Sequence, residues 1–530
     1  MFNKNLAIKD FIVKKRKIYF INPKTPEHFW AMQGALDIVG KHKTLMPNTA
    51  LLTLIALTPD DVPVEYIFCD ENIAPVDWNI SCDLVGITGY TLQFERMQAI
   101  SARFRERGIP VAVGGTYATL DPGKVTNIAD ILFIGEAEYT WPQFLRDWTA
   151  DKANSVYRQD SFIDMKDSPA PDLSYLSAKD YLYFSVQTSR GCPNNCDFCD
   201  VIRVMGRKYR SKSIDQIMYE VKNAHAYGAE TIFFSDDNFL VNKKFTTDLL
   251  QEIIKWNITL DRPLSFSTQA TVMIGAEDDL LKLLADARFS VLFLGLETIS
   301  KECLEEVNKG QMSLYNPYEV IPRISRYGIV PFLGMIVGFD HDTPAVFGEI
   351  EEFLDKTASP IASISVLNAP KNTALYERMK KEGRLIEDFR GFWHLTTNFT
   401  PKQMSLQELY LGHKNLLKKL YEPEHFERRM IRWLENVRYF SDLYSTRKKN
   451  FYRFFRIIRI LRHFLFRAPP SVRAMFWNIL KAAWKINPRL ISRAMSVLVQ
   501  YWHYYDFGHK DSGQKAGLVQ TPAPPFVKGD

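Results

Sequence analysis

Three cysteines stand close together near the middle of the chain. Cys192, Cys196 and Cys199 form a CxxxCxxC run within Ser189-Arg-Gly-Cys-Pro-Asn-Asn-Cys-Asp-Phe-Cys199. Three thiolates on one loop after a strand can ligate three corners of a cubane iron–sulfur cluster, and with no fourth cysteine nearby one iron stays open to an outside ligand. Zinc sites favour CxxC pairs with a fourth Cys or His, so a zinc knuckle fits this spacing less well. The run therefore predicts a cluster that binds something at its open iron.

The aromatic residue before the last cysteine, Phe198, completes a pattern that resembles the radical S-adenosylmethionine (SAM) enzymes. In that family the vacant iron chelates the amino and carboxylate groups of SAM. The resemblance implies a 4Fe–4S cluster held by the three cysteines, Phe198 in the SAM site, and an electron donor such as flavodoxin or ferredoxin.

The bulk composition is that of a globular protein. The 530 residues are 46% apolar and 24% charged, which predicts two to four domains and excludes a disordered or largely membrane-embedded chain. The six cysteines, three of them in one motif, indicate a reducing compartment rather than a disulfide framework. With neither a secretory leader pattern nor a bilayer-length apolar run, we expect a cytoplasmic protein.

Residues 17–150 read as a Rossmann-like domain that follows an N-terminal arm over 1–16. Strand-like runs alternate with helical spacing and a long loop follows the first strand, which predicts a parallel, doubly wound sheet with strands at 17–22, 64–69, 83–89, 110–115 and 130–136. Ligands bind beyond the carboxyl ends of such strands. Those ends carry Thr88, Gly89, Gly114, Gly115, Thr116, Gly135 and Glu136. No G-x-G-x-x-G follows the first strand, which argues against NAD or FAD.

Beyond spacing, this domain resembles the cobalamin-binding domain that precedes many radical SAM barrels, on the stretches 83–88, 113–119 and 134–138. The resemblance implies cobalamin bound by Thr88, Gly89, Gln93, Gly114, Gly115, Thr116, Gly135 and Glu136. The chain lacks the Asp-x-His-x-x-Gly motif that supplies a histidine to cobalt, and we interpret His28 and His42 as surface or loop residues. Cobalamin without histidine ligation is therefore expected.

After a Pro-rich linker over 151–180, residues 181–400 begin a second β/α series. Its strands are expected at 184–189, 231–238, 264–269, 291–297, 329–340 and 361–366, and the resemblance makes them a partial (β/α)6 barrel. Barrel enzymes place their sites at the carboxyl ends of the strands. There the resemblance implies SAM contacts from Asp236, Asp237, Asn238, Gln269, Glu297, Gly334 and Gly338. One of the three residues 236–238 is also a candidate helix cap.

Residues 401–507 read as a helical C-terminal domain, followed by a disordered tail over 508–530. No Asp or Glu occurs from Arg447 to Arg493. Over 451–466, Phe454, Ile458, Leu461 and Leu465 fall on one helix face, with Arg453, Arg456, Arg459 and Arg462 spread over the rest. The basic helices over 451–493 either present a solvated face above a core or contact the inner face of an anionic membrane. No RNA-binding module is evident, so no nucleic-acid partner is expected.

Over residues 17–400 the chain resembles cobalamin-dependent radical SAM enzymes, and more loosely the group of the hopanoid C-2 methylase and the bacteriochlorophyll side-chain methylases. This implies methylation of an unactivated carbon on a small hydrophobic substrate, lipid- or tetrapyrrole-like, through a 5′-deoxyadenosyl radical and methylcobalamin. A non-methylating enzyme such as an oxidative cyclase is the alternative, and a cobalamin or SAM sensor is the alternative of another class. A methylthiotransferase is disfavoured because the N-terminal domain offers only Cys69 and Cys82.

Overall fold

The computed structural model describes residues 15–40, 42–386, 394–444 and 451–509, and the side chains of 451–454 are not among the described atoms. The expected arm over 1–16 and tail over 508–530 lie outside these ranges, apart from residues 15, 16, 508 and 509. The chain divides into two compact units. Unit 1 runs up to Thr25 and includes Asn48–Ile163 and Asp167–Tyr175, and unit 2 comprises Pro26–Pro47, Asp164–Lys166 and the chain from Leu176 onward.

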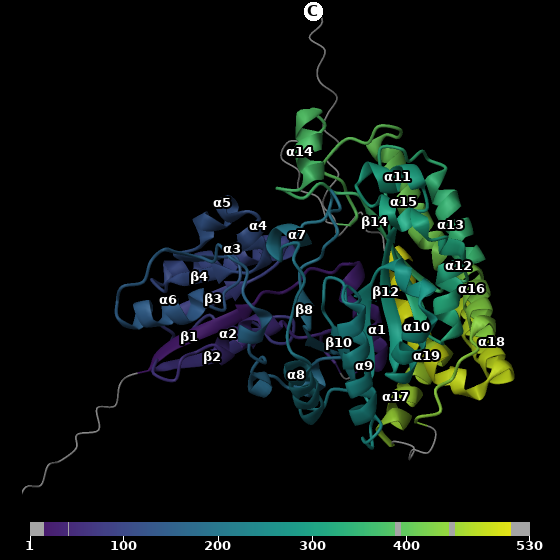
Figure 1. Cartoon of the computed structure of the whole chain (residues 1–530), viewed down its shortest axis with the longest axis horizontal. Coiled ribbons are helices and arrows are strands. Elements are labelled where there is room, and N and C mark those ends of the chain that lie inside the picture. Colours follow the sequence, from purple (N-terminus) through teal and green to yellow (C-terminus); the bar gives the residue numbers. More distant parts are fainter. Residues whose placement is uncertain (1–14, 41, 387–393, 445–450, 510–530) are drawn as a thin grey trace, which may run out of the picture. The chain divides into compact units, whose positions relative to one another are not determined.

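Unit 1 contains a six-stranded sheet in the order β2-β1-β3-β4-β5-β6, with every neighbouring pair parallel (Figure 1). The strands are β1 (Arg16–Asn22), β2 (Val64–Asp70), β3 (Leu84–Thr88), β4 (Val111–Gly114), β5 (Ile131–Ile134) and β6 (Val156–Arg158). The helices are α2 (Thr49–Ala56), α3 (Phe94–Glu106), α4 (Thr116–Leu120), α5 (Pro122–Val125) and α6 (Thr140–Thr149). The order in which strands are added to the sheet reverses between β1 and β3, and such a switch point is where a doubly wound sheet binds its ligands.

The central strands of unit 1 are buried on both sides because helices cover both faces. Every residue of β3 is buried, and Tyr19 and Ile21 of β1 join Met97, Ile100 and Phe104 of α3 in one apolar core. The five expected strands and the doubly wound topology are confirmed. The sixth strand, β6, lies in the stretch that we predicted to be only a linker.

Unit 2 also contains a six-stranded parallel sheet, in the order β14-β13-β12-β11-β10-β7. The strands are β7 (Phe184–Val186), β10 (Thr231–Phe234), β11 (Ser265–Ala270), β12 (Phe289–Glu297), β13 (Val330–Val337) and β14 (Ile361–Val366). The intervening helices are α8 (Ile214–Ala226), α9 (Lys243–Asn257), α10 (Asp278–Asp286), α11 (Lys301–Glu306), α12 (Pro317–Arg326), α13 (Val346–Lys356) and α14 (Ala374–Lys381). All six strands fall at the positions expected from the sequence.

Alternating burial along β12 distinguishes the two faces of this sheet. Leu292, Leu294 and Leu296 are buried, whereas the residues between them, including Gly295 and Glu297, are only partly buried. Successive residues of a strand point to opposite faces. The leucines therefore form the apolar face, and Glu297 ends the opposite, more accessible face.

The segment Pro26–Pro47, expected as a loop after the first strand, belongs to unit 2 and contains the turn η1 (Phe29–Ala31) and the helix α1 (Gln33–Val39). The C-terminal helix α19 (Ile491–His509) holds it: His503 accepts the Gly34 N–H at Nδ1 (3.3 Å) and bonds the Phe29 carbonyl through Nε2 (2.8 Å). Trp30 packs on Phe293 and Phe332 of β12 and β13. These partners lie hundreds of residues away, so no local pattern could predict the helix.

The C-terminal region is helical, as expected. It comprises α15 (Leu406–Leu420), α16 (Pro423–Asn436), α17 (Phe451–Arg462), a π-helical turn (His463–Arg467), α18 (Pro470–Ile486) and α19. Helix α16 packs on α12 and α13, and α18 packs on α16 (Figure 1).

The apolar face expected for the 451–466 helix is corrected by the structure. Ile458 is 41% exposed, whereas Ile460 and Phe464 are buried. The π-helical turn shifts the register after Arg462, so the Phe464 ring stacks on Phe476 of α18 at 4.3 Å. Phe454 has no described side chain.

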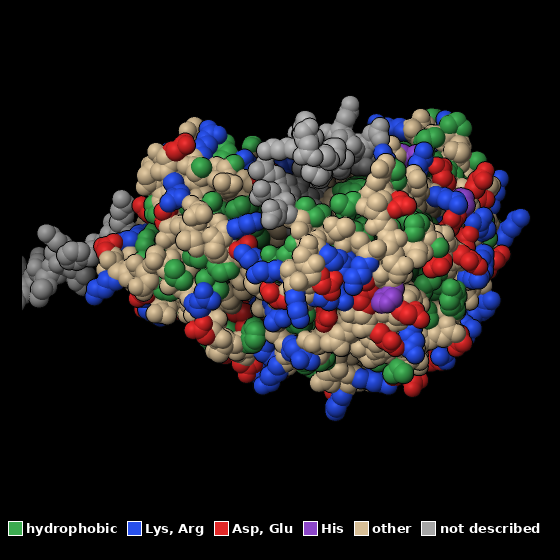
Figure 2. Space-filling model, turned by 90° about the horizontal axis from the view of Figure 1, so that it is seen from above, with side chains coloured by type: hydrophobic (Ala, Val, Ile, Leu, Met, Phe, Trp, Pro, Cys, Tyr) green, Lys and Arg blue, Asp and Glu red, His purple; other side chains and the backbone are tan. Residues whose placement is uncertain are grey.

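Charged side chains of both signs are interspersed over the face of the molecule seen in Figure 2. None of the helices within the described residues has the length and apolarity needed to cross a bilayer.

Candidate active site

The three cysteines lie on a loop that a small hairpin closes. Strand β8 (Ser189–Arg190) pairs antiparallel with β9 (Arg210–Ser211), and the loop between them includes the short helix α7 (Val201–Val204). At the neck, Gly191 has a φ of 91°, and a Cβ there would lie 2.3 Å from the Lys208 carbonyl oxygen. Only glycine fits this turn without strain.

Cys192, Cys196 and Cys199 are free thiols. They lie close enough for the charge of one to affect the pKa of another. Burial, together with neighbouring acidic groups and cysteines, raises the pKa of Cys196 to about 11 and that of Cys199 to about 12. Three partly buried thiols with raised pKa values require nearby positive charge in order to ionise. A bound metal cluster supplies such charge, so the loop fits one.

Two aspartates that follow β10 hold this loop in place. Asp236 is fully buried, and its Oδ1 accepts the N–H groups of Thr188 (2.6 Å) and Ser189 (2.9 Å) while its Oδ2 accepts the Thr188 hydroxyl. Asp237 Oδ2 accepts the Gly191 N–H at 2.9 Å. Both oxygens of Asp236 are therefore committed to the chain entering the cysteine loop, which makes it a positioning residue.

The polar residues at the ends of β10 and β11 lie together beneath the loop. Gln269 donates from Nε2 to the Asp236 carbonyl at 2.7 Å, and Asn238 Oδ1 accepts the Leu240 N–H at 3.3 Å. Asn238 thus acts as the local turn cap that was one of the alternatives for residues 236–238. Gln269 remains partly accessible.

A buried ion pair stands next to the cysteines at the end of β12. Lys309 Nζ lies 2.5 Å from Glu297 Oε1 and 2.9 Å from the Gly295 carbonyl oxygen, and the Lys309 side chain is only 6% exposed. Burial lowers the pKa of Lys309, but the charges of Glu297, Cys196 and Cys199 outweigh it and leave the pKa raised. The lysine therefore carries a positive charge beside the sulfurs.

Sequence reasoning identified Glu297 and missed Lys309. The residue stands after α11 in an ordinary Asn-Lys-Gly stretch, where a lysine is usually solvated. The one available signal was that a glutamate ending a buried strand needs a cationic partner.

The remaining predicted SAM residues frame the same end of the sheet. Phe198, between the second and third cysteines, packs against an apolar cluster that includes Val307 and Phe339. Gly334 lies within β13 opposite the Phe293 ring, and the Gly338 N–H donates to Asp342 Oδ2 at 2.8 Å. Unit 2 therefore brings the cysteine loop and the ends of β10 to β13 together.

The predicted cobalamin residues lie at the carboxyl edge of the unit 1 sheet. Thr88 and Gly89 end β3, Gly114 to Thr116 join β4 to α4, and Gly135 with Glu136 follows β5. Gly115, with a φ of 93°, touches Thr88: a Cβ would lie 2.2 Å from the threonine Oγ1.

Two of these residues are already engaged within unit 1. Gln93 is 3% exposed, and it donates to the Pro23 carbonyl (2.6 Å) and accepts the Tyr90 N–H (3.0 Å). Glu136 accepts the Ile163 N–H at 2.8 Å. Both residues therefore shape the loops of this edge.

The histidines interpreted as surface or loop residues are placed within unit 2. His28 caps η1 by accepting the Trp30 N–H at 3.1 Å, and burial lowers its pKa to about 4. It is therefore a partly buried loop residue, one of the two alternatives expected. His42 is also in unit 2.

Comparison with known proteins also relates unit 2 to the radical SAM enzymes. The Radical SAM superfamily matches residues 186–354, and a domain of unknown function (DUF4070) matches residues 373–516. An uncharacterised methyltransferase of Synechocystis is 30% identical over 92% of this chain and 91% of its own length. The hopanoid C-2 methylase of Rhodopseudomonas palustris is 31% identical over 70% of this chain and 72% of its own.

Among solved structures, the radical SAM methyltransferase TsrM of Kitasatospora setae, with cobalamin and a 4Fe–4S cluster bound, superposes with a TM-score of 0.62. The match covers 89% of this chain and all of TsrM at 16% identity. It therefore establishes a common fold.

Proposed function

The chain belongs to the radical SAM superfamily, in the group of the hopanoid C-2 methylase, and from this premise we propose that it is a cobalamin-dependent methyltransferase acting on an unactivated carbon of a small hydrophobic substrate. The observation that carries the proposal is the cysteine loop, with three free thiols beside the buried Lys309–Glu297 pair.

Within this site, Cys192, Cys196 and Cys199 would hold the cluster, which supplies the electron for cleavage of SAM when bound. Asp236 and Asp237 fix the loop through the bonds to residues 188–191. These bonds anchor the backbone just before Cys192.

Lys309 and Glu297 offer one charge of each sign to SAM, which carries a carboxylate, an ammonium and ribose hydroxyls. We infer that Lys309 binds the carboxylate and Glu297 the ammonium or the ribose. The same pocket would include Phe198, Asp237, Asn238, Gln269, Gly334 and Gly338, while Asp236 contributes through the loop. A ferredoxin or flavodoxin would deliver the electron.

Cobalamin would bind at the switch point of unit 1, where it carries the methyl group that is transferred. The support is the strand order with its reversal between β1 and β3, together with the tight contact of Gly115 with Thr88 at that edge. His28 and His42, which we do not interpret as cobalt ligands, belong to unit 2.

Gly115→Val should reduce the cobalamin bound per chain at least about tenfold, because the new side chain would collide with Thr88 and strain a positive φ. The measurement is the cobalamin content after reconstitution and gel filtration. Gly123→Val is the matched control, since a Cβ there meets only Asp121 at 3.8 Å. Equal loading of all three proteins would move the cobalamin site away from this edge.

We also propose that helix α18 rests on an anionic membrane from which a lipid-like substrate is taken. Trp477 and Trp484 are 37% and 64% exposed, and Lys481 and Lys485 between and beside them are exposed as well. Amphipathic aromatic rings with lysines on one helix face suit the boundary between headgroups and acyl chains. Two arginines of α17 are less available for contact with lipid, since Arg456 pairs with Glu230 and Arg459 bonds the Gly40 carbonyl.

The double variant Trp477→Ala/Trp484→Ala is expected to weaken binding to vesicles of anionic phospholipid by about tenfold or more. The reason is that each exposed indole would bury apolar area at the membrane interface. Sedimentation with vesicles measures it. Tyr219→Ala removes an equally exposed aromatic (64%) from α8 and should change nothing. Unchanged binding of the double variant would leave α18 as a solvated face.

The proposal as a whole is tested by comparing apolar extracts of wild-type and deletion strains by mass spectrometry. Loss of a compound in the deletion strain, with accumulation of the same compound lacking one methyl group on carbon, is expected. Accumulation of a precursor that differs by ring closure or oxidation would favour an oxidative cyclase instead.

A further inference from the structure

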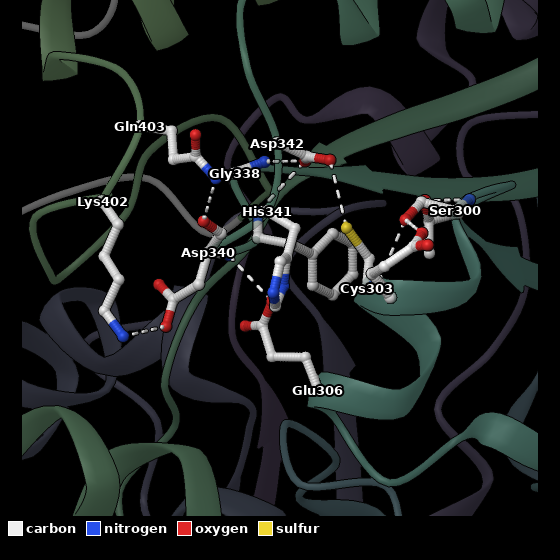
Figure 3. Close-up of polar contacts among 12 residues, drawn as sticks. Ser300, Cys303, Glu306, Gly338, Asp340, His341, Asp342, Lys402 and Gln403 are labelled. Carbon is white, nitrogen blue, oxygen red and sulfur yellow. Dashed lines mark hydrogen bonds and ion pairs between the residues drawn. The ribbon is translucent and has the colours of Figure 1, made fainter.

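A second group of metal-ligating side chains lies on α11 and on the turn that follows β13. Cys303 and Glu306 stand one helical turn apart on α11, and His341 lies in the turn (Figure 3). Their ligand atoms all lie within 4.8 Å of one another. Glu306 Oε2 is 3.1 Å from His341 Nδ1.

The surrounding contacts leave the right atoms of these side chains facing one another. Arg378 donates to Glu306 Oε1 at 2.9 Å, while Glu306 Oε2 accepts the Asp340 N–H at 3.0 Å and keeps its second lone pair toward His341. Asp342 Oδ2 accepts backbone N–H groups of the turn, so its Oδ1 faces the Cys303 Sγ at 3.4 Å. Such outer contacts are what orient the ligands of protein metal sites.

The buried acidic groups around Cys303, Glu306 and His341 favour a bound cation. Glu306 has a side chain only 3% exposed and Cys303 is 1% exposed, and Asp342 is buried next to them. The described cations nearby are divided: Arg378 is shared between Glu306 and Asp340, while Arg384 and Lys402 pair with Asp340. With the thiol ionised, three negative charges would face the single charge of Arg378.

We propose that Cys303 Sγ, Glu306 Oε2 and His341 Nδ1 form a binding site for Zn²⁺, with Asp342 Oδ1 or water as the fourth ligand. Sulfur, imidazole nitrogen and carboxylate oxygen are the ligands that Zn²⁺ takes in a tetrahedral site. Binding displaces the proton of the Cys303 thiol to solvent, and His341, whose side chain is 53% exposed, provides the entry path.

Such an ion would fasten two parts of the pocket wall together. Helix α11 connects Glu297 to Lys309, and the turn with His341 begins just after Gly338. Joining them would fix the spacing between the Lys309–Glu297 pair and the β13 edge. The site is independent of the proposed function, since it requires neither the reaction nor the cofactors.

The test uses the reconstituted protein, whose three loop cysteines are occupied by iron, after addition of Zn²⁺ and removal of the excess. We expect one zinc per chain, and zinc-edge X-ray absorption with a single sulfur at about 2.3 Å and nitrogen or oxygen at about 2.0–2.2 Å. His341→Ala, an exposed position that should not perturb folding, and Cys303→Ser should each weaken zinc binding by about a hundredfold or more, since even outer partners of metal ligands contribute about 10- to 100-fold.

His425→Ala is the matched control. His425 Nδ1 also lies close to a glutamate, 3.3 Å from Glu351 Oε1, and the metal-ligating group that the described residues form does not include it. Its zinc binding should equal that of the unchanged protein. Absence of zinc beyond the loop, zinc without a sulfur neighbour, or equal binding by the His341 and Cys303 variants would overturn the proposal.

Discussion

Replacing Cys192, Cys196 or Cys199 by alanine is expected to abolish formation of 5′-deoxyadenosine from SAM, because two thiolates cannot retain a cubane cluster whose fourth iron is open. Anaerobic reconstitution should give about four iron atoms per chain in the unchanged protein and close to none in each variant. Iron and sulfide analysis, the visible spectrum and deoxyadenosine formation under dithionite measure the three consequences.

Cys82→Ala supplies the control for this series. Cys82 is a partly buried free thiol of unit 1, outside the loop, and burial raises its pKa to about 11. Its iron content and SAM cleavage should match the unchanged protein. A variant lacking all three loop cysteines that still holds iron, or an unchanged protein that takes up zinc in the loop instead, would contradict the assignment.

Lys309→Met is expected to reduce kcat/KM for SAM cleavage by about tenfold to a hundredfold while the cluster stays in place. The variant removes a charge-assisted partner of the SAM carboxylate, a bond that contributes about 1.5–3 kcal/mol, and it leaves Glu297 buried without its cation. Iron content separates this effect from loss of the cluster, and a raised KM for SAM separates it from general unfolding.

Lys301→Met is the matched control for this variant. Lys301 also pairs with a glutamate, Glu305 at 3.7 Å, but both side chains are exposed on the outer side of α11. Such surface pairs contribute little, so its kinetics should be unchanged. Equal kinetics for the two lysine variants would remove Lys309 from the SAM site.

The strands and the cysteine loop could be predicted because their signals are local. Residues 84–88 are buried throughout and apolar up to Thr88, since helices cover both faces of the sheet, and the spacing of Cys192, Cys196 and Cys199 is itself the local pattern that predicts a cluster. Glu297 was identifiable because a carboxylate at the end of a buried strand is costly unless it has a function or a partner.

The features that sequence could not give depend on distant contacts. Lys309 differs from other lysines only in its ion pair with Glu297, which the fold creates. Helix α1 depends on a hydrogen bond from its Gly34 N–H to His503 of α19. Asp236 was expected at SAM, but its side chain turns inward because the chain at residues 188–189 brings unpaired N–H groups to it. Helix α17 packs on α1, a segment distant in the sequence, with Ile460 buried and Ile458 exposed, and the apolar pattern alone does not show which of the two is buried.

We infer that SAM serves this enzyme in two ways, as the source of the deoxyadenosyl radical and as the methyl donor. The most direct measurement supplies the reduced holoenzyme with SAM labelled in its methyl group and with apolar extract from the deletion strain, and quantifies the products by mass spectrometry. Equal amounts of S-adenosylhomocysteine, 5′-deoxyadenosine and labelled product are predicted. Substrate-dependent deoxyadenosine without homocysteine product or label in the extract would contradict methylation.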